Sequence, residues 1–278
     1  MPEPLRPEAW RDLVRLALAE DLGPGDVTSQ AIVPADRTAE GVFVAKADLV
    51  LAGFDVAREV FVQVDPSIVW TPACRDGDRC QPGRHLGTVC GTARGLLAAE
   101  RTALNLLQHL SGIATSTRAF VDAARPLNVL DTRKTLPGLR ALEKYAVVCG
   151  GGRNHRTGLF DAVLIKDNHI RVAGGIHAAV SRVRDAGAPG PIEVETQSLE
   201  QVDEAIAAGA DIIMLDNLDD AATAAAIGRI AGRARVELSG NMTLDRVKRL
   251  AASGADDVSV GALTHSAPAA DISLEIAV

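Results

Sequence analysis

The second half of the chain alternates short, mainly apolar runs with segments of helical periodicity. Alanine-rich segments with helical spacing, such as Leu199–Ala208 and Ala221–Ile230, separate the later runs. Strands that are buried on both faces read as apolar runs, and a regular strand–helix alternation indicates a parallel sheet. The six runs are Asn128–Leu130, Ala162–Ile165, Ile192–Val194, Ile212–Leu215, Val236–Leu238 and Val258–Val260.

Both a doubly wound sheet and a barrel agree with this alternation. Six runs are too few for an eight-stranded barrel, so we favour a closed but incomplete α/β barrel. We expect this barrel domain to cover residues 111–267.

The first hundred residues have a different pattern, typical of a small α+β unit. An amphipathic helix is expected over Pro7–Glu20 and a second helix over Phe54–Val64, after Gly53. Two further helices, Leu96–Leu110 and Thr115–Ala124, should be separated by a break at Ser111-Gly112. The expected strands of this part are Thr38–Ala45, Ile68–Thr71 and Leu86–Gly91.

The C-terminal segment Asp271–Val278 alternates like a strand again. We expect it to leave the barrel and to join the N-terminal unit. The N-terminal domain would then comprise residues 1–110 together with 268–278.

Composition excludes several classes of protein. The formal net charge is −7 and aromatic residues make up only 3% of the chain, which argues against a nucleic-acid partner. The four cysteines show no C-x-x-C spacing, so neither a disulfide framework nor a zinc site is expected. The N-terminal residues lack the basic and apolar regions of a signal peptide, and no apolar run is long enough to span a bilayer. We therefore expect a cytoplasmic protein without a membrane partner.

Polar or small residues follow each of the six runs directly. The carboxyl ends of parallel barrel strands meet at one mouth, where barrel enzymes place their chemistry. Any one of these residues alone could equally serve as a helix cap, and Asp219-Asp220 is interpreted in that way, as charges at a helix N-terminus. The residues that follow the runs are Asp131, Arg133, Lys134, Lys166, Glu195, Asp216, Ser239, Gly240 and Gly261.

Cations are concentrated between Asp131 and His169, although the chain as a whole is acidic. A bound polyanion is a physical reason for such a concentration, and a solvated basic face is the alternative. The cations are Arg133, Lys134, Arg140, His155, Arg156, Lys166 and His169.

Several motifs in this order resemble the quinolinate phosphoribosyltransferase family. They are D-T-R-K-T-L-P-G-L-R, G-G-G-R-N-H-R, L-I-K-D-N-H, V-E, L-D-N, S-G and G-A-L-T-H-S, preceded by G-D-V-T and E-R-T-A-L-N-L-L-Q-H-L-S-G-I-A-T. The resemblance covers nearly the whole chain. It implies an open-faced α/β sandwich with an incomplete α/β barrel, in a protein that is usually a homodimer. It also implies the reaction of quinolinate with phosphoribosyl pyrophosphate (PRPP), which gives nicotinate mononucleotide, pyrophosphate and carbon dioxide in NAD biosynthesis.

The resemblance also implies a role for each matching residue. Quinolinate is a planar dicarboxylate, and guanidinium groups bind carboxylates bidentately. The expected carboxylate contacts are Arg133, His155, Arg156 and Lys166, together with Arg101 donated by the partner subunit.

The second substrate, PRPP, carries a phosphate, a ribose and a pyrophosphate that binds magnesium. Lys134 is expected at the pyrophosphate, while Glu195 and Asp216 are expected at the ribose hydroxyls and at Mg²⁺, directly or through water. The same three residues are the expected catalytic groups. The residues expected to cradle a phosphate are Ser239, Gly240 and Gly261.

The chain departs from the family pattern at two positions. Leu136 stands where threonine is common, and Asn241 follows Ser239-Gly240 where glycine is frequent. The first departure concerns fine substrate contacts and not the class of reaction.

Three other interpretations stay open from the sequence. A related transferase would use nicotinate or nicotinamide, although five candidate cations favour a dicarboxylate. A different barrel enzyme would use Lys166 as a Schiff-base nucleophile. A non-catalytic paralogue should have lost some of Lys134, Glu195 and Asp216, and all three are present.

Overall fold

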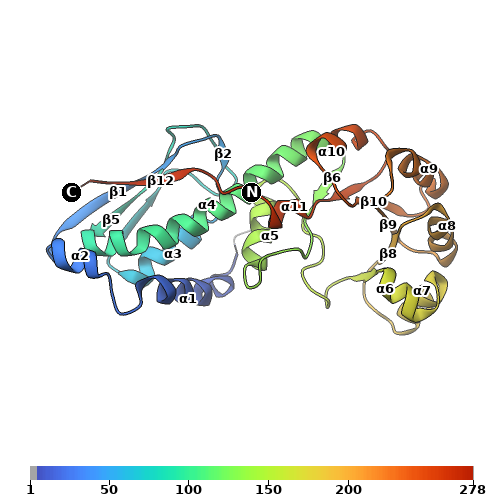
Figure 1. Ribbon diagram of the computed structural model, residues 1–278, viewed down its shortest axis with the longest axis horizontal. Coiled ribbons are helices and arrows are strands. Elements are labelled where there is room, and N and C mark those ends of the chain that lie inside the picture. Colours follow the sequence, from blue (N-terminus) through green and yellow to red (C-terminus); the bar gives the residue numbers. More distant parts are fainter. Residues whose placement is uncertain (1–4, 278) are drawn as a thin grey trace. The chain divides into compact units, whose positions relative to one another are not determined.

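The computed structural model describes residues 5–277 (Figure 1). These residues form two compact units, which we describe separately. The first contains the chain up to Arg118, the stretch Leu136–Gly151 and the end of the chain from Ser266. The second contains Ala119–Thr135 and Gly152–His265. Residues 1–4 and Val278, the last residue of the predicted C-terminal strand, lie outside the described part.

The first unit is built on a four-stranded antiparallel sheet. Its strand order is β12 (Ile272–Ala277), β1 (Thr38–Ala45), β5 (His85–Thr92) and β3 (Val69–Pro72). β12 pairs with β1 along its whole length, so the prediction that the C-terminal segment joins the N-terminal unit is confirmed. A separate two-stranded ladder joins β2 (Leu49–Val50) to β4 (Arg79–Cys80).

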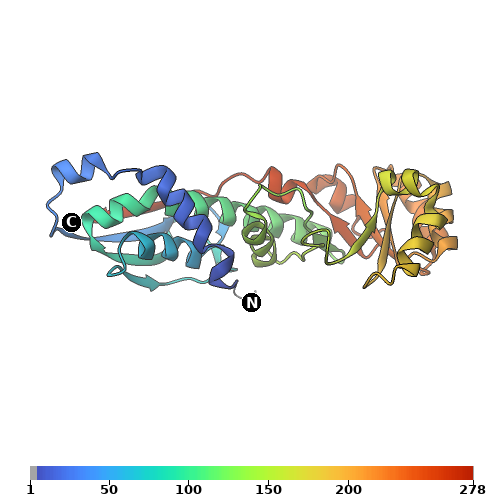
Figure 2. The ribbon, with the colours of Figure 1, turned by 90° about the horizontal axis from the view of Figure 1, so that it is seen from below.

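Helices cover one face of this sheet (Figure 2). Phe54 and Phe61 of α3 pack against Phe43 of β1 with ring centroids 5.9 and 6.0 Å away, and Trp70 of β3 completes the cluster. Buried aromatic rings in edge-to-face contact contribute strongly to a core of this size. The helical elements are the 3₁₀ turn η1 (Pro7–Ala9), α1 (Arg11–Leu22), α2 (Val27–Ile32), α3 (Phe54–Val64) and the start of α4 (Ala93–Ala124).

The predicted break at Ser111-Gly112 is wrong, because α4 runs without interruption through this pair. Gly112 is needed for packing and not for a turn. A Cβ atom at this position would lie 2.1 Å from the carbonyl oxygen of Pro268, so only glycine lets the two backbones approach so closely.

Helix α5 (Arg140–Cys149) belongs to the first unit, although the predicted barrel domain included these residues. Its polar side chains bond to neighbours from earlier in the chain. Tyr145 donates to Asp76 at 2.9 Å, and Glu143 lies 2.9 Å from His109 of α4. These contacts are between residues far apart in sequence, and the pattern of residues along the chain does not indicate them.

The second unit is a six-stranded parallel sheet wrapped into an incomplete barrel. Its strand order is β6 (Asn128–Leu130), β11 (Asp257–Ser259), β10 (Arg235–Ser239), β9 (Ile212–Asp216), β8 (Ile192–Thr196) and β7 (Val163–Ile165). The first strand therefore pairs with the last, as in a barrel. β6 and β7 do not pair with each other, and a single bridge from Leu130 to Arg153 lies at this gap.

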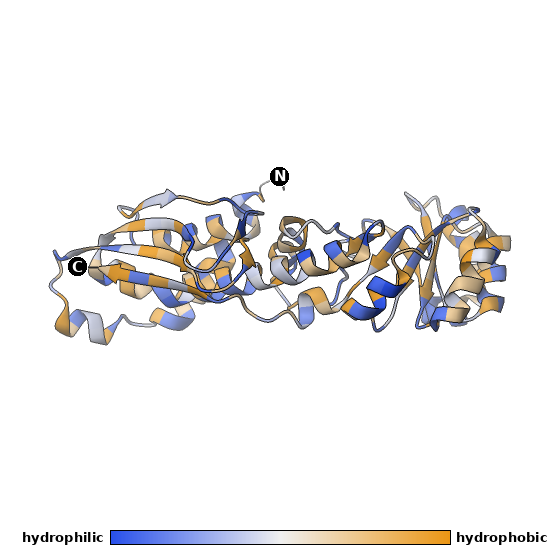
Figure 3. Cartoon of the chain, turned by 90° about the horizontal axis from the view of Figure 1, so that it is seen from above, coloured by the Kyte–Doolittle hydropathy of each residue, from blue (hydrophilic) through white to orange (hydrophobic). Residues whose placement is uncertain are grey.

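Helices lie between successive strands on the outside of this barrel, and they contain both hydrophilic and hydrophobic residues (Figures 1 and 3). Asp219 caps the N-terminus of α9 by accepting a bond from the Ala222 amide at 2.7 Å, as interpreted from the sequence. The helices of this unit are α6 (Asp167–Ala173), α7 (Ile176–Asp185), α8 (Leu199–Ala208), α9 (Asp220–Ile230), α10 (Leu244–Leu250) and α11 (Ala262–His265).

Strands β8 and β10 alternate apolar and polar residues, whereas β7 is apolar throughout and β9 is apolar up to Asp216. Val194, Ile213 and Leu238 are buried, and so are the polar neighbours Glu193, Glu195 and Glu237. Because successive side chains of a strand point to opposite faces, the apolar set packs under the outer helices and the polar set points into the barrel. Barrel interiors are usually filled with branched aliphatic side chains. This barrel has an acidic interior instead.

No helix in the described residues is both long enough and apolar enough to cross a membrane. All four cysteines are free thiols in this structure.

Candidate functional site

A cavity of about 570 Å³ lies at the carboxyl ends of the barrel strands. Its wall is formed by residues of the second unit that end or follow β6 to β11. The cavity brings together most of the residues predicted for the site. These are Arg133, Lys134, His155, Arg156, Lys166, Glu195, Asp216, Ser239 and Gly240.

The two remaining predicted residues lie elsewhere. Arg101 is exposed on α4, in the first unit. Gly261 follows β11, and a Cβ atom there would lie 3.0 Å from Cδ of Lys134. Gly261 therefore leaves room for the lysine side chain.

Two arginines form the most buried cationic part of the wall. Burial lowers the pKa of Arg156, and the positive charge of Arg133 lowers it further. Nε of Arg133 is buried without a hydrogen-bond partner among the described residues. Two guanidinium groups held close together with unused donors favour the binding of an anion between them.

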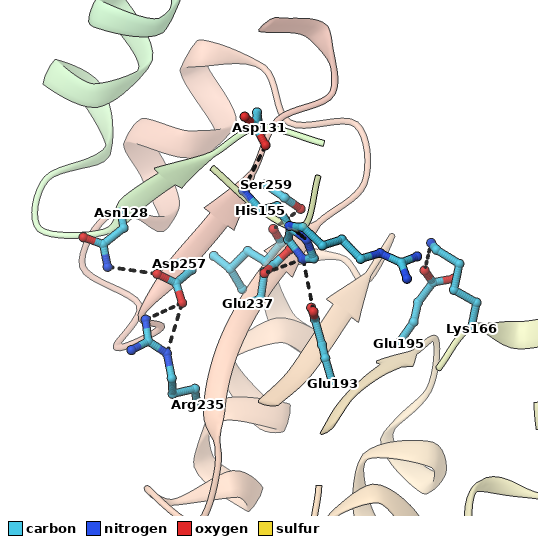
Figure 4. Close-up of polar contacts among 12 residues, drawn as sticks. Asn128, Asp131, His155, Lys166, Glu193, Glu195, Arg235, Glu237, Asp257 and Ser259 are labelled. Atoms are coloured by element: carbon cyan, nitrogen blue, oxygen red, sulfur yellow. Dashed lines mark hydrogen bonds and ion pairs between the residues drawn. The ribbon is translucent and has the colours of Figure 1, made fainter. Parts of the chain in front are cut away.

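Lys166 and Glu195, which also line the cavity, form an ion pair (Figure 4). Lys166 follows β7 directly, and its amide donates to Nδ1 of His169 at 3.0 Å, which caps the start of α6. His169, which the sequence placed in the cationic cluster, therefore acts here as a hydrogen-bond acceptor.

The ends of β9 and β10 form a tightly linked pair of loops. The Asn217 amide donates to the Ser239 carbonyl at 3.1 Å, and the Asn241 side chain donates to Oδ1 of Asn217 at the same distance. Gly240 has a φ of 89°, and a Cβ atom there would lie 2.3 Å from Oδ1 of Asn217. A glycine is therefore required at this position.

Asn217 was missed by the sequence analysis as a site residue. It donates to Asp216 through its side chain at 2.8 Å, so it orients the carboxylate that the sequence singled out. The L-D-N motif contained this signal, since asparagine tolerates the left-handed conformation that it adopts here, with a φ of 57°.

Lys134 is exposed at the mouth and held through its main chain. Its amide donates to Oγ1 of Thr132 at 3.0 Å, and its carbonyl accepts from Oγ1 of Thr264 at 2.7 Å. The main chain of this loop is thus fixed, while Lys134 lines the cavity as an exposed residue.

Deeper in the barrel, His155 contacts two glutamates that the sequence analysis also missed. Its Nε2 lies 3.1 Å from Glu193 and 3.5 Å from Glu237, and its Nδ1 accepts from the Arg156 amide at 2.7 Å (Figure 4). Burial raises the pKa of Glu237 to about 8, and the charge of Glu193 acts in the same direction. Both glutamates lie inside strands, Glu193 in β8 and Glu237 in β10. The sequence analysis interpreted these strands as apolar runs and therefore overlooked the polar positions within them.

Two family models cover most of the chain. The model described as the N-terminal domain of quinolinate phosphoribosyl transferase matches residues 26–111, and the C-terminal domain model matches residues 113–275.

Curated proteins and solved structures show the same similarity. A carboxylating nicotinate-nucleotide pyrophosphorylase of Mycobacterium leprae is 48% identical over 97% of this chain and 98% of its own length. A chloroplastic protein of the same name from Arabidopsis thaliana is 46% identical over 95% of this chain and 82% of its own. The crystal structure of NadC from Streptococcus pyogenes has a TM-score of 0.94 and 43% identity, with 99% of both chains covered.

Proposed function

Because the chain belongs to the quinolinate phosphoribosyltransferase family, we propose that it transfers the phosphoribosyl group of PRPP to quinolinate with loss of carbon dioxide. The products are nicotinate mononucleotide, pyrophosphate and carbon dioxide, in the de novo synthesis of NAD. The observation that carries this proposal is one cavity lined by two arginines and two lysines together with three carboxylates, Glu195, Asp216 and Glu237. This set of charges suits an anionic ring and a phosphorylated sugar together.

In this proposal, the two carboxylates of quinolinate bind to Arg133, Arg156 and Lys166. The positive charge of Arg133 lowers the pKa of Arg156, which indicates that the two guanidinium groups lie close together, and Lys166 forms an ion pair with Glu195 of the neighbouring strand. A dicarboxylate neutralises this cationic wall better than nicotinate does, because nicotinate has only one carboxylate. Arg101 of the partner subunit adds a further cation.

PRPP occupies the mouth of the cavity. Lys134 binds the pyrophosphate, and the main chain around Ser239, Gly240 and Gly261 binds the 5′-phosphate. The linked loops at Asn217 and Gly240 support this assignment, because they fix the amides of a phosphate site in advance.

Glu195 and Asp216 are the residues that would hold Mg²⁺ or contact the ribose hydroxyls. They suit a hard cation, because both are carboxylates that line the same cavity at the ends of adjacent strands. When bound, the ion supplies positive charge to the pyrophosphate of PRPP.

The reaction needs no covalent intermediate with the protein. The bond from C1 of the ribose to pyrophosphate breaks as the pyridine nitrogen of quinolinate bonds to C1. Lys134 stabilises the departing pyrophosphate, and Glu195 and Asp216 stabilise positive charge at the ribose. Carbon dioxide then leaves, and the electron pair of the C2–carboxylate bond stays on C2, where the positive charge of the adjacent pyridinium nitrogen stabilises it. This pair takes up a proton from water, which completes nicotinate mononucleotide.

The homodimer and the cytoplasmic location expected from the sequence remain predictions. The Arabidopsis relative is named as chloroplastic, so location varies among similar proteins.

A comparison of substrates tests the proposed function. Purified protein with PRPP and Mg²⁺ should convert quinolinate to a mononucleotide and should leave nicotinate unchanged. Conversion of nicotinate would overturn the dicarboxylate assignment, and no product from either substrate would indicate a non-catalytic paralogue. A product trapped on Lys166 by borohydride would favour a Schiff-base enzyme instead.

A further inference from the structure

The interior of the barrel contains a buried acid–histidine cluster, formed by His155, Glu193 and Glu237. Glu193 is 4% exposed and Glu237 is 2% exposed. One oxygen of each carboxylate has no hydrogen-bond partner among the described residues. Burying two carboxylates so close together is costly, so a cluster of this kind calls for a specific role.

The cluster lies beside the gap between β6 and β7. The segment from Arg153 to Arg156 runs along this gap, where no strand pairing joins β6 to β7. The Arg153 amide donates to the Val129 carbonyl at 2.8 Å, and the Asp131 amide donates to the Arg153 carbonyl at 3.1 Å. The His155 amide then donates to Oδ1 of Asp131 at 2.9 Å.

The Arg156 amide donates to Nδ1 of the His155 ring. The ring therefore connects the backbone of Arg156 to Glu193 on β8 and Glu237 on β10, across the interior of the barrel (Figure 4).

This arrangement fixes the tautomer of His155. Nδ1 accepts a hydrogen bond, so it carries no proton, and the proton of the neutral ring is on Nε2. Nε2–H then donates to the glutamates.

A metal ion in the cluster is a competing explanation, because one histidine and two carboxylates are a suitable ligand set. Coordination would use the lone pair of Nε2 and move the proton to Nδ1. Two donors, Nδ1–H and the Arg156 amide, would then face each other. The hydrogen bond therefore favours the glutamates as the direct partners of the ring.

We propose that Glu193 and Glu237 are positioning residues for the dicarboxylate site, which act through the His155 ring to hold Arg156 against the cavity. This inference rests on the proposed function. In this inference the role of His155 is to support Arg156, because both ring nitrogens of His155 already have protein partners.

Glutamine at position 237 keeps a side-chain oxygen that can accept a hydrogen bond from Nε2 of His155. A leucine of similar size removes the acceptor at position 237 and leaves Glu193 as the one glutamate beside Nε2. The two substitutions thus separate the acceptor from simple filling of space.

The test compares Glu237→Leu, Glu237→Gln and the control Asp257→Asn. Asp257 is buried in the same barrel interior, but its carboxylate pairs with Arg235 at 2.6 Å. Glu237→Leu should raise the KM for quinolinate by about tenfold or more while changing the KM for PRPP by less than about twofold. Glu237→Gln should keep the KM for quinolinate close to the wild-type value. Asp257→Asn should lower Tm without a selective change in the KM for quinolinate or for PRPP.

A spectroscopic measurement keeps the inference testable if activity is absent. In protein with ¹⁵N-labelled histidine, the signal of His155 is identified as the one that disappears in His155→Asn. This signal should show the Nε2–H tautomer in the wild type and a shifted tautomer equilibrium in Glu237→Leu. An Nδ1–H tautomer in the wild type would overturn the inference, and so would equal rises of both KM values in Glu237→Leu. An inactive wild type with the Nε2–H tautomer would instead count against the proposed function alone.

Discussion

Among single residues, Lys134 is the most direct test of the proposed chemistry. Its side chain is exposed at the cavity mouth and its loop is held by main-chain bonds, so the fold does not depend on its ammonium group. Lys134→Ala should lower kcat by about 10²- to 10³-fold, the usual cost of losing one group that stabilises transition-state charge.

The matched control is Lys248→Ala, which removes an exposed lysine of α10. Steady-state kinetics with quinolinate and circular-dichroism melting curves would be measured for both variants. A kcat for Lys134→Ala close to that of Lys248→Ala would remove Lys134 from the mechanism.

Gly240 offers a second residue-scale prediction. Gly240→Ala forces a side chain against Asn217 and an unfavourable positive φ, so we expect a raised KM for PRPP and a loss of stability of about 1–3 kcal/mol. Gly232→Ala is the control, because Gly232 also has a positive φ, 76°, but has open space around it.

Kinetic and thermal measurements on this pair separate backbone strain from the contact with Asn217. Both variants should lose stability, and only Gly240→Ala should bind PRPP more weakly. Equal KM values for PRPP in the two variants would contradict the phosphate-loop assignment.

At the scale of helices and strands, much of the fold could be predicted from the sequence. The strand Thr38–Ala45 and the helix Phe54–Val64 were predicted with the observed bounds, because their patterns are local. The glycine inside α4 is explained by the close approach of Pro268, which is far away in the sequence, so no local pattern could show that Gly112 serves packing and not a helix break.

The candidate site was predictable to a similar degree. The residues at strand ends were identified because a parallel barrel brings them to one mouth. Glu193 and Glu237 were missed because their importance depends on which face of a strand points inward and on the gap between β6 and β7, which are properties of the folded barrel.

The packing of α4 yields a prediction about stability. Gly112→Ala should lower Tm clearly, because the new methyl group meets the carbonyl of Pro268. Gly228→Ala in α9 has no atom within 4 Å of the new Cβ and should raise stability by about 0.5–1 kcal/mol, as expected for alanine within a helix. Calorimetry of the two variants measures both effects, and a stabilised Gly112→Ala would contradict the close approach.

For the whole molecule, the main prediction concerns Arg101. If a partner subunit donates Arg101, a heterodimer of one Arg101→Ala chain and one Lys134→Ala chain contains one complete site. Such a heterodimer, purified through two different tags, should have roughly half the activity of the wild-type dimer.

Each mutant homodimer serves as the control and should be nearly inactive. A heterodimer as inactive as its parents would show that Arg101 acts within its own chain. A monomeric protein by light scattering would exclude the dimer on which this prediction depends.

The central claim is that one cavity couples phosphoribosyl transfer to decarboxylation. The most direct measurement uses quinolinate labelled in its C2 carboxylate and follows labelled carbon dioxide, nicotinate mononucleotide and pyrophosphate together. The account predicts equal amounts of all three, and no carbon dioxide when PRPP is omitted, because the pyridinium forms only after transfer. Release of carbon dioxide without PRPP, or nucleotide that keeps the label, would contradict it.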